Sequence, residues 1–118
     1  MTPPLLQARS LTKRFEDIVA VDGLDLNVQA GEVLGLLGVN GAGKTTVMNM
    51  ILGLTIPNEG SIEVFGKDLQ NHRIEILRRT NFCTTYANLP SNLKVWQNLR
   101  VFAGLYGVKN PREKIEEL

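Results

Sequence analysis

The sequence predicts a mixed α/β fold in which an antiparallel β region precedes a partial parallel core. Apolar and polar residues alternate through Leu24–Val28, which is typical of a strand with one face in water. The next run, Val33–Leu37, is continuously apolar and bounded by turn residues, as in a parallel strand covered on both faces. An amphipathic helix over Lys44–Leu52 follows a glycine-rich loop, so the chain has the strand–loop–helix order of an α/β unit.

The other expected elements complete this order. Strands are predicted at Leu5–Leu11, Ile18–Val28, Ser61–Phe65 and Asn81–Thr85, and helices at Asn71–Arg79 and Val95–Tyr106. A further helix is predicted to start at Asn110-Pro111, because asparagine is a common helix cap and proline suits the first helical position. The 118 residues show no internal repeat and are enough for one small domain.

Composition and charge exclude several classes of protein. The formal net charge of +1 provides no strong field for nucleic acid, so no such partner is expected. The single cysteine, Cys83, rules out an internal disulfide and is expected to be a small buried residue in its strand. The single histidine, His72, is expected to be exposed at a helix start. Without a signal-peptide pattern or a run of about 18 apolar residues, we expect a cytoplasmic chain.

The strongest motif is a glycine-rich loop, Gly38-Val39-Asn40-Gly41-Ala42-Gly43-Lys44-Thr45. Glycines allow unusual backbone dihedrals and leave no Cβ between the backbone and a ligand. Inward N–H groups and the positive end of the following helix then form an anion site. We expect Lys44 to reach the β- and γ-phosphates of a nucleotide, Thr45 to ligate Mg²⁺ and Thr46 to touch the α-phosphate. The motif therefore predicts a P-loop NTPase that binds ATP.

The loop and its flanks resemble the ATP-binding domain of ATP-binding-cassette (ABC) transporters. The resemblance covers nearly the whole chain and implies a partial ABC-type domain, with the β region and nucleotide-binding core over 1–85 and the start of a helical subdomain over 86–118. Four segments carry it, namely the Walker A motif at 38–46, the N-terminal β region at 11–26, the strand after the Walker A helix at 57–66 and the opening of the helical subdomain at 93–99.

The resemblance also implies the contacts of the site and its partners. Phe15 corresponds to the aromatic residue that stacks on adenine. ATP and Mg²⁺ are the implied cofactors. A transmembrane subunit or domain and a second ATP-binding domain are the implied partners, which would hold the chain at the cytoplasmic side of a membrane. The implied phosphate-binding residues are Gly38, Asn40, Gly41, Ala42, Gly43, Lys44, Thr45 and Thr46.

Two positions depart from the family pattern. The glutamine of the family's Q-loop, which contacts Mg²⁺ and the attacking water, would fall at or near Thr85, where the sequence has no glutamine. A threonine reaches less far, so this contact is weakened while nucleotide binding is not affected. Lys94 stands where the family commonly has a threonine cap, and the loss of a cap costs a helix about 1 kcal/mol.

Several family motifs do not occur in this sequence, namely the Leu-Ser-Gly-Gly-Gln-like signature, the Walker B strand with its acidic residues, and the switch histidine. Hydrolysis of the γ-phosphate needs a positioned water, a metal and charge stabilisation. No residue is therefore assigned a catalytic role, and we expect binding without efficient hydrolysis by these residues alone. The run 33–37 would lack a neighbouring strand, so we expect the 118-residue chain to be poorly soluble or oligomeric.

Three other functions are compatible with parts of the sequence. A non-transporter ABC ATPase of translation or DNA repair usually carries long insertions in the helical part, and none is seen. A P-loop kinase or GTPase is disfavoured by the β region ahead of the loop, and a GTPase also by the lack of an Asn-Lys-x-Asp motif. A truncated chain that binds nucleotide without hydrolysis is the third alternative.

Overall fold

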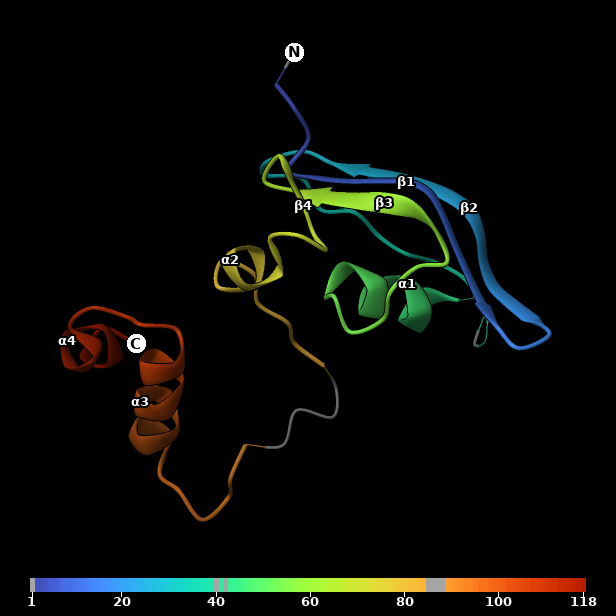
Figure 1. The fold of residues 1–118 in the computed structure, drawn as a ribbon. Coiled ribbons are helices and arrows are strands. Elements are labelled where there is room, and N and C mark those ends of the chain that lie inside the picture. Colours follow the sequence, from blue (N-terminus) through green and yellow to red (C-terminus); the bar gives the residue numbers. More distant parts are fainter. Residues whose placement is uncertain (1, 40, 42, 85–88) are drawn as a thin grey trace. The chain divides into compact units, whose positions relative to one another are not determined.

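The computed structural model describes residues 2–39, 41, 43–84 and 89–118. The chain divides into two compact units, residues 1–80 and 81–118. Within these described residues, the first unit contains a sheet with two helices, and the second contains two helices (Figure 1). Since every glycine of the predicted loop precedes residue 80, the candidate site belongs to the first unit.

The first unit is built on a four-stranded antiparallel sheet with the strand order β2-β1-β3-β4. Its strands are β1 (Leu6–Phe15), β2 (Ile18–Val28), β3 (Glu59–Val64) and β4 (Lys67–Asp68). The strand predicted at Ile18–Val28 is confirmed at both ends. The first strand continues beyond its predicted end because β2 pairs with it as far as Phe15, which lies opposite Ile18.

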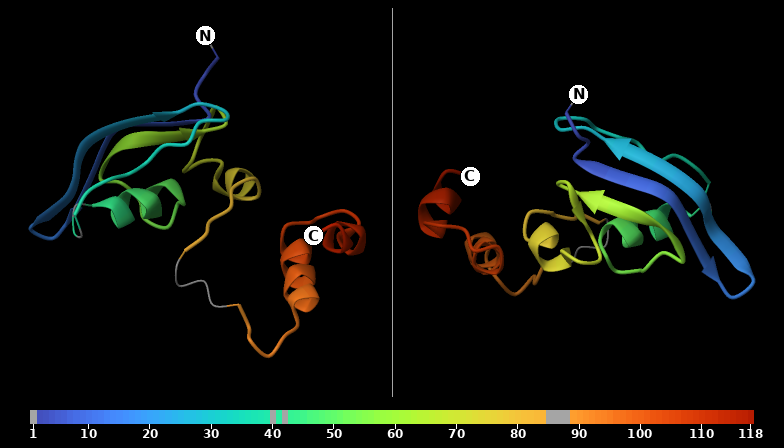
Figure 2. Two further views of the ribbon diagram at one scale, coloured as in Figure 1. Left: turned by 180° about the vertical axis from the view of Figure 1, so that it is seen from behind. Right: turned by 45° about the horizontal axis from the view of Figure 1, so that its top comes forward.

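Helix α1 (Lys44–Ile51) covers one face of this sheet (Figures 1 and 2). Its two buried side chains, Val47 and Met50, are three positions apart and therefore point to the same side of the helix. They pack against strand side chains, which fixes the helix, and so the loop before it, on the sheet. The buried core consists of Ala8, Leu11, Val21, Val47, Met50, Ile62, Val64, Leu69 and Ile76.

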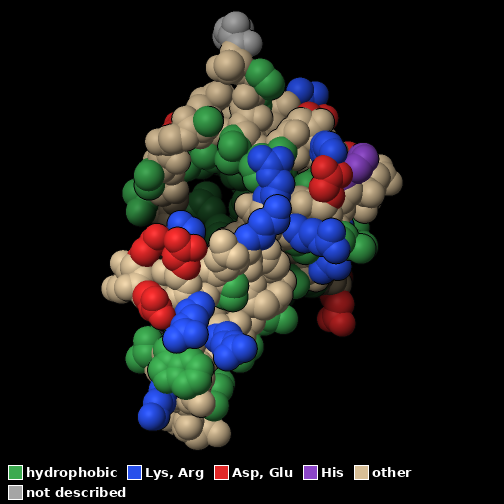
Figure 3. All heavy atoms as spheres, turned by 90° about the vertical axis from the view of Figure 1, so that its left-hand side faces the viewer, with side chains coloured by type: hydrophobic (Ala, Val, Ile, Leu, Met, Phe, Trp, Pro, Cys, Tyr) green, Lys and Arg blue, Asp and Glu red, His purple; other side chains and the backbone are tan. Residues whose placement is uncertain are grey.

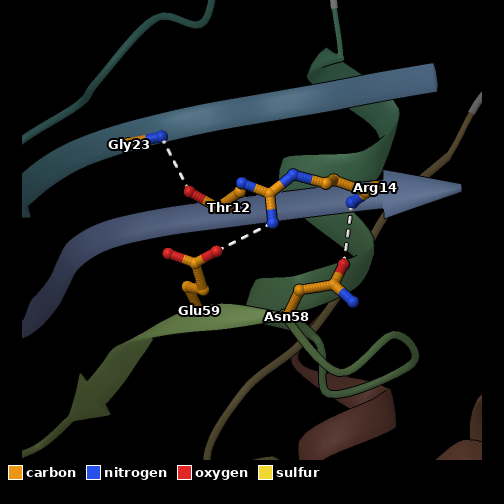
Figure 4. A network of polar contacts seen from close by, with 5 residues as sticks. All are labelled: Thr12, Arg14, Gly23, Asn58 and Glu59. Carbon is orange, nitrogen blue, oxygen red and sulfur yellow. Dashed lines mark hydrogen bonds and ion pairs between the residues drawn. The ribbon is translucent and has the colours of Figure 1, made fainter. Parts of the chain in front are cut away.

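A polar network joins the second half of β1 to its neighbours (Figure 4). The buried hydroxyl of Thr12 accepts a hydrogen bond of 3.0 Å from the Gly23 amide of β2. On the other side, the Arg14 amide donates to Oδ1 of Asn58 and its guanidinium pairs with Glu59, both at 2.7 Å. These contacts hold the end of β1 between β2 and the segment that leads into β3.

The apolar run 33–37 is not a strand, contrary to the prediction. Val33 and Leu37 are 97% and 95% exposed, and only Leu36 packs against the core. A strand needs a neighbour that supplies hydrogen-bond partners, and no strand in the described ranges pairs with this run. The mixed α/β class is confirmed, but the sheet that is described is wholly antiparallel and the expected parallel strand is missing from it.

Helix α2 (Arg73–Leu77) ends the first unit and is shorter than the predicted helix at 71–79. Its N-terminal neighbour His72 is exposed, as predicted. Figure 3 shows the histidine on the surface of the molecule. This short helix contributes only Ile76 to the core, so it closes one end of the sheet and does not extend the site.

The second unit contains α3 (Val95–Leu105) and α4 (Pro111–Glu116), close to their predicted positions. The strand predicted at 81–85 is not formed over 81–84, and Thr85 lies outside the described residues. Cys83 is exposed, contrary to the prediction, because a strand that does not form buries none of its side chains. Among the described residues, no helix has the length and apolar character needed to cross a membrane.

Candidate functional site

The candidate site is the end of the glycine-rich loop and the first turn of α1. The helix begins at Lys44, directly after Gly43, so its first amide groups face the loop. No acidic residue occurs in the first turn. The free N–H groups and the positive end of the helix dipole therefore act on the loop without a neighbouring negative charge.

Gly43 fixes where this helix starts. Its φ of 88° lies in the left-handed region, which only glycine adopts at low cost. A Cβ at this position would lie 2.2 Å from the carbonyl oxygen of Ala20 in β2. Gly43 is thus required both by its own backbone and by the close approach of the loop to β2. This contact anchors the helix N-terminus to the sheet.

Lys44 folds back over the loop that precedes it. Its ammonium donates hydrogen bonds to the carbonyl oxygens of Gly38 and Val39, the latter at 2.8 Å. The positive charge is therefore held against the start of the loop, close to the helix N-terminus. Thr45 is exposed and Thr46 is half-buried in the first turn. The structure thus brings together the backbone, the cation and the hydroxyl groups that the sequence predicts.

The remaining predicted loop residues are placed only in part. Gly41 has a φ of 87°, a second left-handed position in the loop. Asn40 and Ala42 lie outside the described residues, as does Thr85 at the expected Q-loop position. Gly38 has a φ of 159°, which is close to extended backbone and differs from the left-handed values of Gly41 and Gly43. Gly41 and Gly43 therefore have the positive φ values that are common in loops that bind anions through their amides.

Phe15 lies at the same end of the sheet as the loop. It is the last residue of β1, it is 47% exposed, and it pairs with Ile18 in β2. Ala20, whose carbonyl contacts Gly43, is two residues further along β2. An aromatic residue and the glycine-rich loop are therefore both held at the start of β2.

Two features of the site were not predicted from the sequence. The contact between Gly43 and Ala20 joins positions 23 residues apart, and no local pattern indicates it. The network from Arg14 to Asn58 and Glu59 joins residues more than 40 positions apart. In the described part of the chain, no group of three or more His, Cys, Asp and Glu side chains could hold a metal ion. The predicted metal ligand, Thr45, is exposed in the first turn of α1.

A model of the ABC transporter family matches residues 21–118. The probable multidrug ABC transporter ATP-binding protein YbhF of Escherichia coli K12 is 39% identical over 97% of the chain, which covers 20% of that protein. Nod factor export ATP-binding protein I of Cupriavidus metallidurans is 38% identical over 97% of the chain and 38% of its own length. The bacitracin transport ATP-binding protein BcrA of Bacillus licheniformis is 37% identical over the same shares.

Solved structures give a consistent result. The ATP-binding subunit of an ABC transporter superposes with a TM-score of 0.80 and 28% identity, over 90% of this chain and 44% of that one. A dimeric ATP-binding cassette bound to ADP and Pi has a TM-score of 0.76 at 23% identity, over 95% of this chain and 54% of that one, and shows the fold alone. The chain spans between a fifth and two fifths of the curated relatives described above.

Proposed function

Since this chain belongs to the ABC transporter family, we propose that it binds ATP through its glycine-rich loop and the start of α1. The family match confirms the resemblance that the motifs predict. One observation carries the proposal for these residues. Gly43 fastens the N-terminus of α1 to β2 while Lys44 holds its ammonium over the same loop, so a helix end and a cation converge on one point.

Each residue has a role that follows from its position. Lys44 exchanges its two loop carbonyls for the β- and γ-phosphate oxygens, which are stronger acceptors because they are charged. Thr46 contacts the α-phosphate, and Phe15 stacks on the adenine ring. The backbone amides of the loop surround the phosphates. This set comprises Gly38, Asn40, Gly41, Ala42 and Gly43.

Mg²⁺ fits the Thr45 position by the chemistry of its donor. Mg²⁺ prefers oxygen ligands and usually binds through few protein groups together with water and phosphate oxygens. Thr45 offers one exposed hydroxyl in the first turn of α1, beside the place where the phosphates would lie. The metal would neutralise phosphate charge there. In this proposal, Thr45 supplies the protein ligand, and its hydroxyl would hold Mg²⁺ beside the loop.

The larger role is coupling of ATP hydrolysis to transport across a membrane. The chain covers a minor part of relatives that are described as transport and export ATP-binding proteins. We place it in an ATP-binding subunit or domain that works with a transmembrane partner and a second ATP-binding domain, at the cytoplasmic face of the membrane. Hydrolysis requires an acidic group that polarises the attacking water, and we assign no acidic residue of this sequence to that role.

The phosphate contacts can be tested with Lys44→Ala. Loss of charge-assisted hydrogen bonds worth about 1.5–3 kcal/mol lowers affinity for a fluorescent ATP analogue with Mg²⁺ by tenfold or more. The matched control is Lys114→Ala in α4, which removes an exposed lysine of the other unit and leaves affinity unchanged. Equal affinity of the wild-type chain and Lys44→Ala would rule out the proposed phosphate site.

A further inference from the structure

Lys13 contacts both the aromatic ring at the end of β1 and the segment that follows α1. Its ammonium lies 5.1 Å from the centroid of the Phe15 ring. The same ammonium donates a hydrogen bond of 2.9 Å to the carbonyl oxygen of Ile56. A flexible lysine side chain is therefore held at both points, and its charge is fixed over one face of the ring.

The segment that holds Lys13 is itself fastened to β1 on both sides of it. The Asn58 amide donates to the carbonyl oxygen of Thr12 at 2.8 Å, and the Asn58 side chain accepts from the Arg14 amide. Three consecutive residues of β1 thus each make a contact with the segment 56–59. These contacts hold the segment 56–59 beside β1, so the hydrogen bond to Ile56 keeps the Lys13 ammonium near the ring.

A cation over an aromatic ring acts on the ring in two ways. It is attracted to the negative π-face, which restricts the orientation of the ring. It also draws electron density toward itself, so the opposite face becomes less negative and stacks better on an electron-rich base. Phe15 is 47% exposed, so part of the ring remains accessible while Lys13 covers the other part.

We propose that Lys13 is a positioning residue for the purine base, which holds Phe15 so that the ring face opposite the ammonium stacks on the nucleotide. This inference rests on the proposed function, because it assumes that the phosphates bind at the loop. Lys13 acts through Phe15 and touches neither phosphate nor metal. By orienting Phe15, Lys13 increases the contribution of the base to binding. The site therefore binds nucleotides more tightly than ligands that carry phosphates alone.

Two probes separate the base from the phosphates, namely Mg²⁺-ATP and Mg²⁺-tripolyphosphate, which has the same phosphate chain without a base. In Lys13→Met, which keeps the length of the side chain and removes its charge, affinity for ATP falls about two- to fivefold. Affinity for tripolyphosphate stays at the wild-type value. Lys13→Arg, which keeps a cation, retains most of the affinity for ATP. Lys67→Met, which removes a lysine from β4, is the matched control and changes neither affinity.

The same substitution in a variant without the Phe15 ring tests whether Lys13 acts through that ring. In Phe15→Ala, which removes the ring, adding Lys13→Met causes no further loss of affinity for ATP. The inference is overturned if Lys13→Met leaves ATP binding unchanged, if it weakens tripolyphosphate binding equally, or if its effect persists in Phe15→Ala. Failure of the proposed function gives a different result, because the wild-type chain would then bind neither probe. Circular dichroism of each variant shows that the chain is folded.

Discussion

At the scale of single residues, the two glycines that flank position 42 have nearly the same φ and different surroundings. Gly41 and Gly43 have φ values of 87° and 88°. A Cβ on Gly41 would meet nothing within 4 Å, whereas one on Gly43 would meet the backbone of Ala20. The motif requires glycine at both positions, but the cost of replacing them differs because only Gly43 packs against the sheet.

Gly43→Ala is therefore expected to lower the free energy of unfolding by more than the cost of placing alanine in a left-handed conformation. The dihedral costs about 1–2 kcal/mol, and the backbone clash adds to it because neither α1 nor β2 can move freely. Urea unfolding followed by circular dichroism measures the difference. Gly31→Ala is the control, since its φ of 78° is also left-handed and its Cβ would lie in open space. Equal destabilisation by the two substitutions would contradict the clash.

At the scale of elements, β4 and α2 are too short to be stable alone, and an ion pair between them adds to the pairing of β4 with β3 and to the hydrogen bond from Arg73 to Gly53. The ammonium of Lys67 in β4 pairs with Glu75 in α2, on the surface of the first unit. The hydrogen bond from Lys67 lowers the pKa of Glu75 from its ordinary value, although partial desolvation opposes this change. The two elements are thus linked by charge as well as by Leu69 and Ile76 in the core.

The pKa of Glu75 gives a pH dependence with a defined sign. A carboxyl group with a lowered pKa in the folded chain contributes stability above its unfolded pKa, and this contribution is lost as the pH falls through the lowered value. NMR titration of the Glu75 side chain should show the lowered pKa, and Lys67→Met should raise it toward the ordinary value. A pKa that is unaltered by this substitution would show that Lys67 is not its cause.

The ends of the helices also show how context changes the role of a residue. Lys94 precedes α3 and its ammonium cannot cap the helix, as expected. The side chain of Gln97 compensates in part, because its Oε1 accepts a hydrogen bond of 2.8 Å from the Lys94 amide. Asn110 precedes α4 as predicted but makes no side-chain cap, since its backbone is left-handed. The Asn110-Pro111 pair therefore located the start of α4 without determining the bonds made there, whereas the start of α3 was located by its apolar spacing.

At the scale of the whole molecule, the run 33–37 is an apolar segment of the first unit that is left exposed to water. Val33 and Leu37 are almost fully exposed, and the sheet offers this run no neighbouring strand among the described residues. Apolar side chains in such a segment favour association with another surface, because their burial removes apolar area from water.

The 118-residue chain is accordingly expected to self-associate as its concentration rises. The double substitution Val33→Lys and Leu37→Lys should reduce the association, because buried ammonium groups would have to lose their water. Light scattering coupled to gel filtration measures the mass. Leu118→Lys is the control, since Leu118 is 92% exposed in the other unit. A wild-type chain that remains a monodisperse monomer would contradict this expectation.

The sequence by itself determined the loop, the start of α1, the hairpin strand Ile18–Val28 and the family. These depend on local requirements, namely glycine dihedrals, helix-terminal amides and the period of two in a strand. These requirements can be recognised in the sequence because each one involves only a few neighbouring residues.

Only the tertiary structure decided what those segments contact. It placed Gly43 against Ala20 and Lys13 over Phe15, left Val33–Leu37 unpaired and exposed Cys83. Each of these results depends on whether a partner lies close in space, and strand pairing or close packing between distant positions leaves no signal in one local pattern. The apolar run shows this most clearly, since its composition is that of a buried strand and its surroundings provide no strand to pair with.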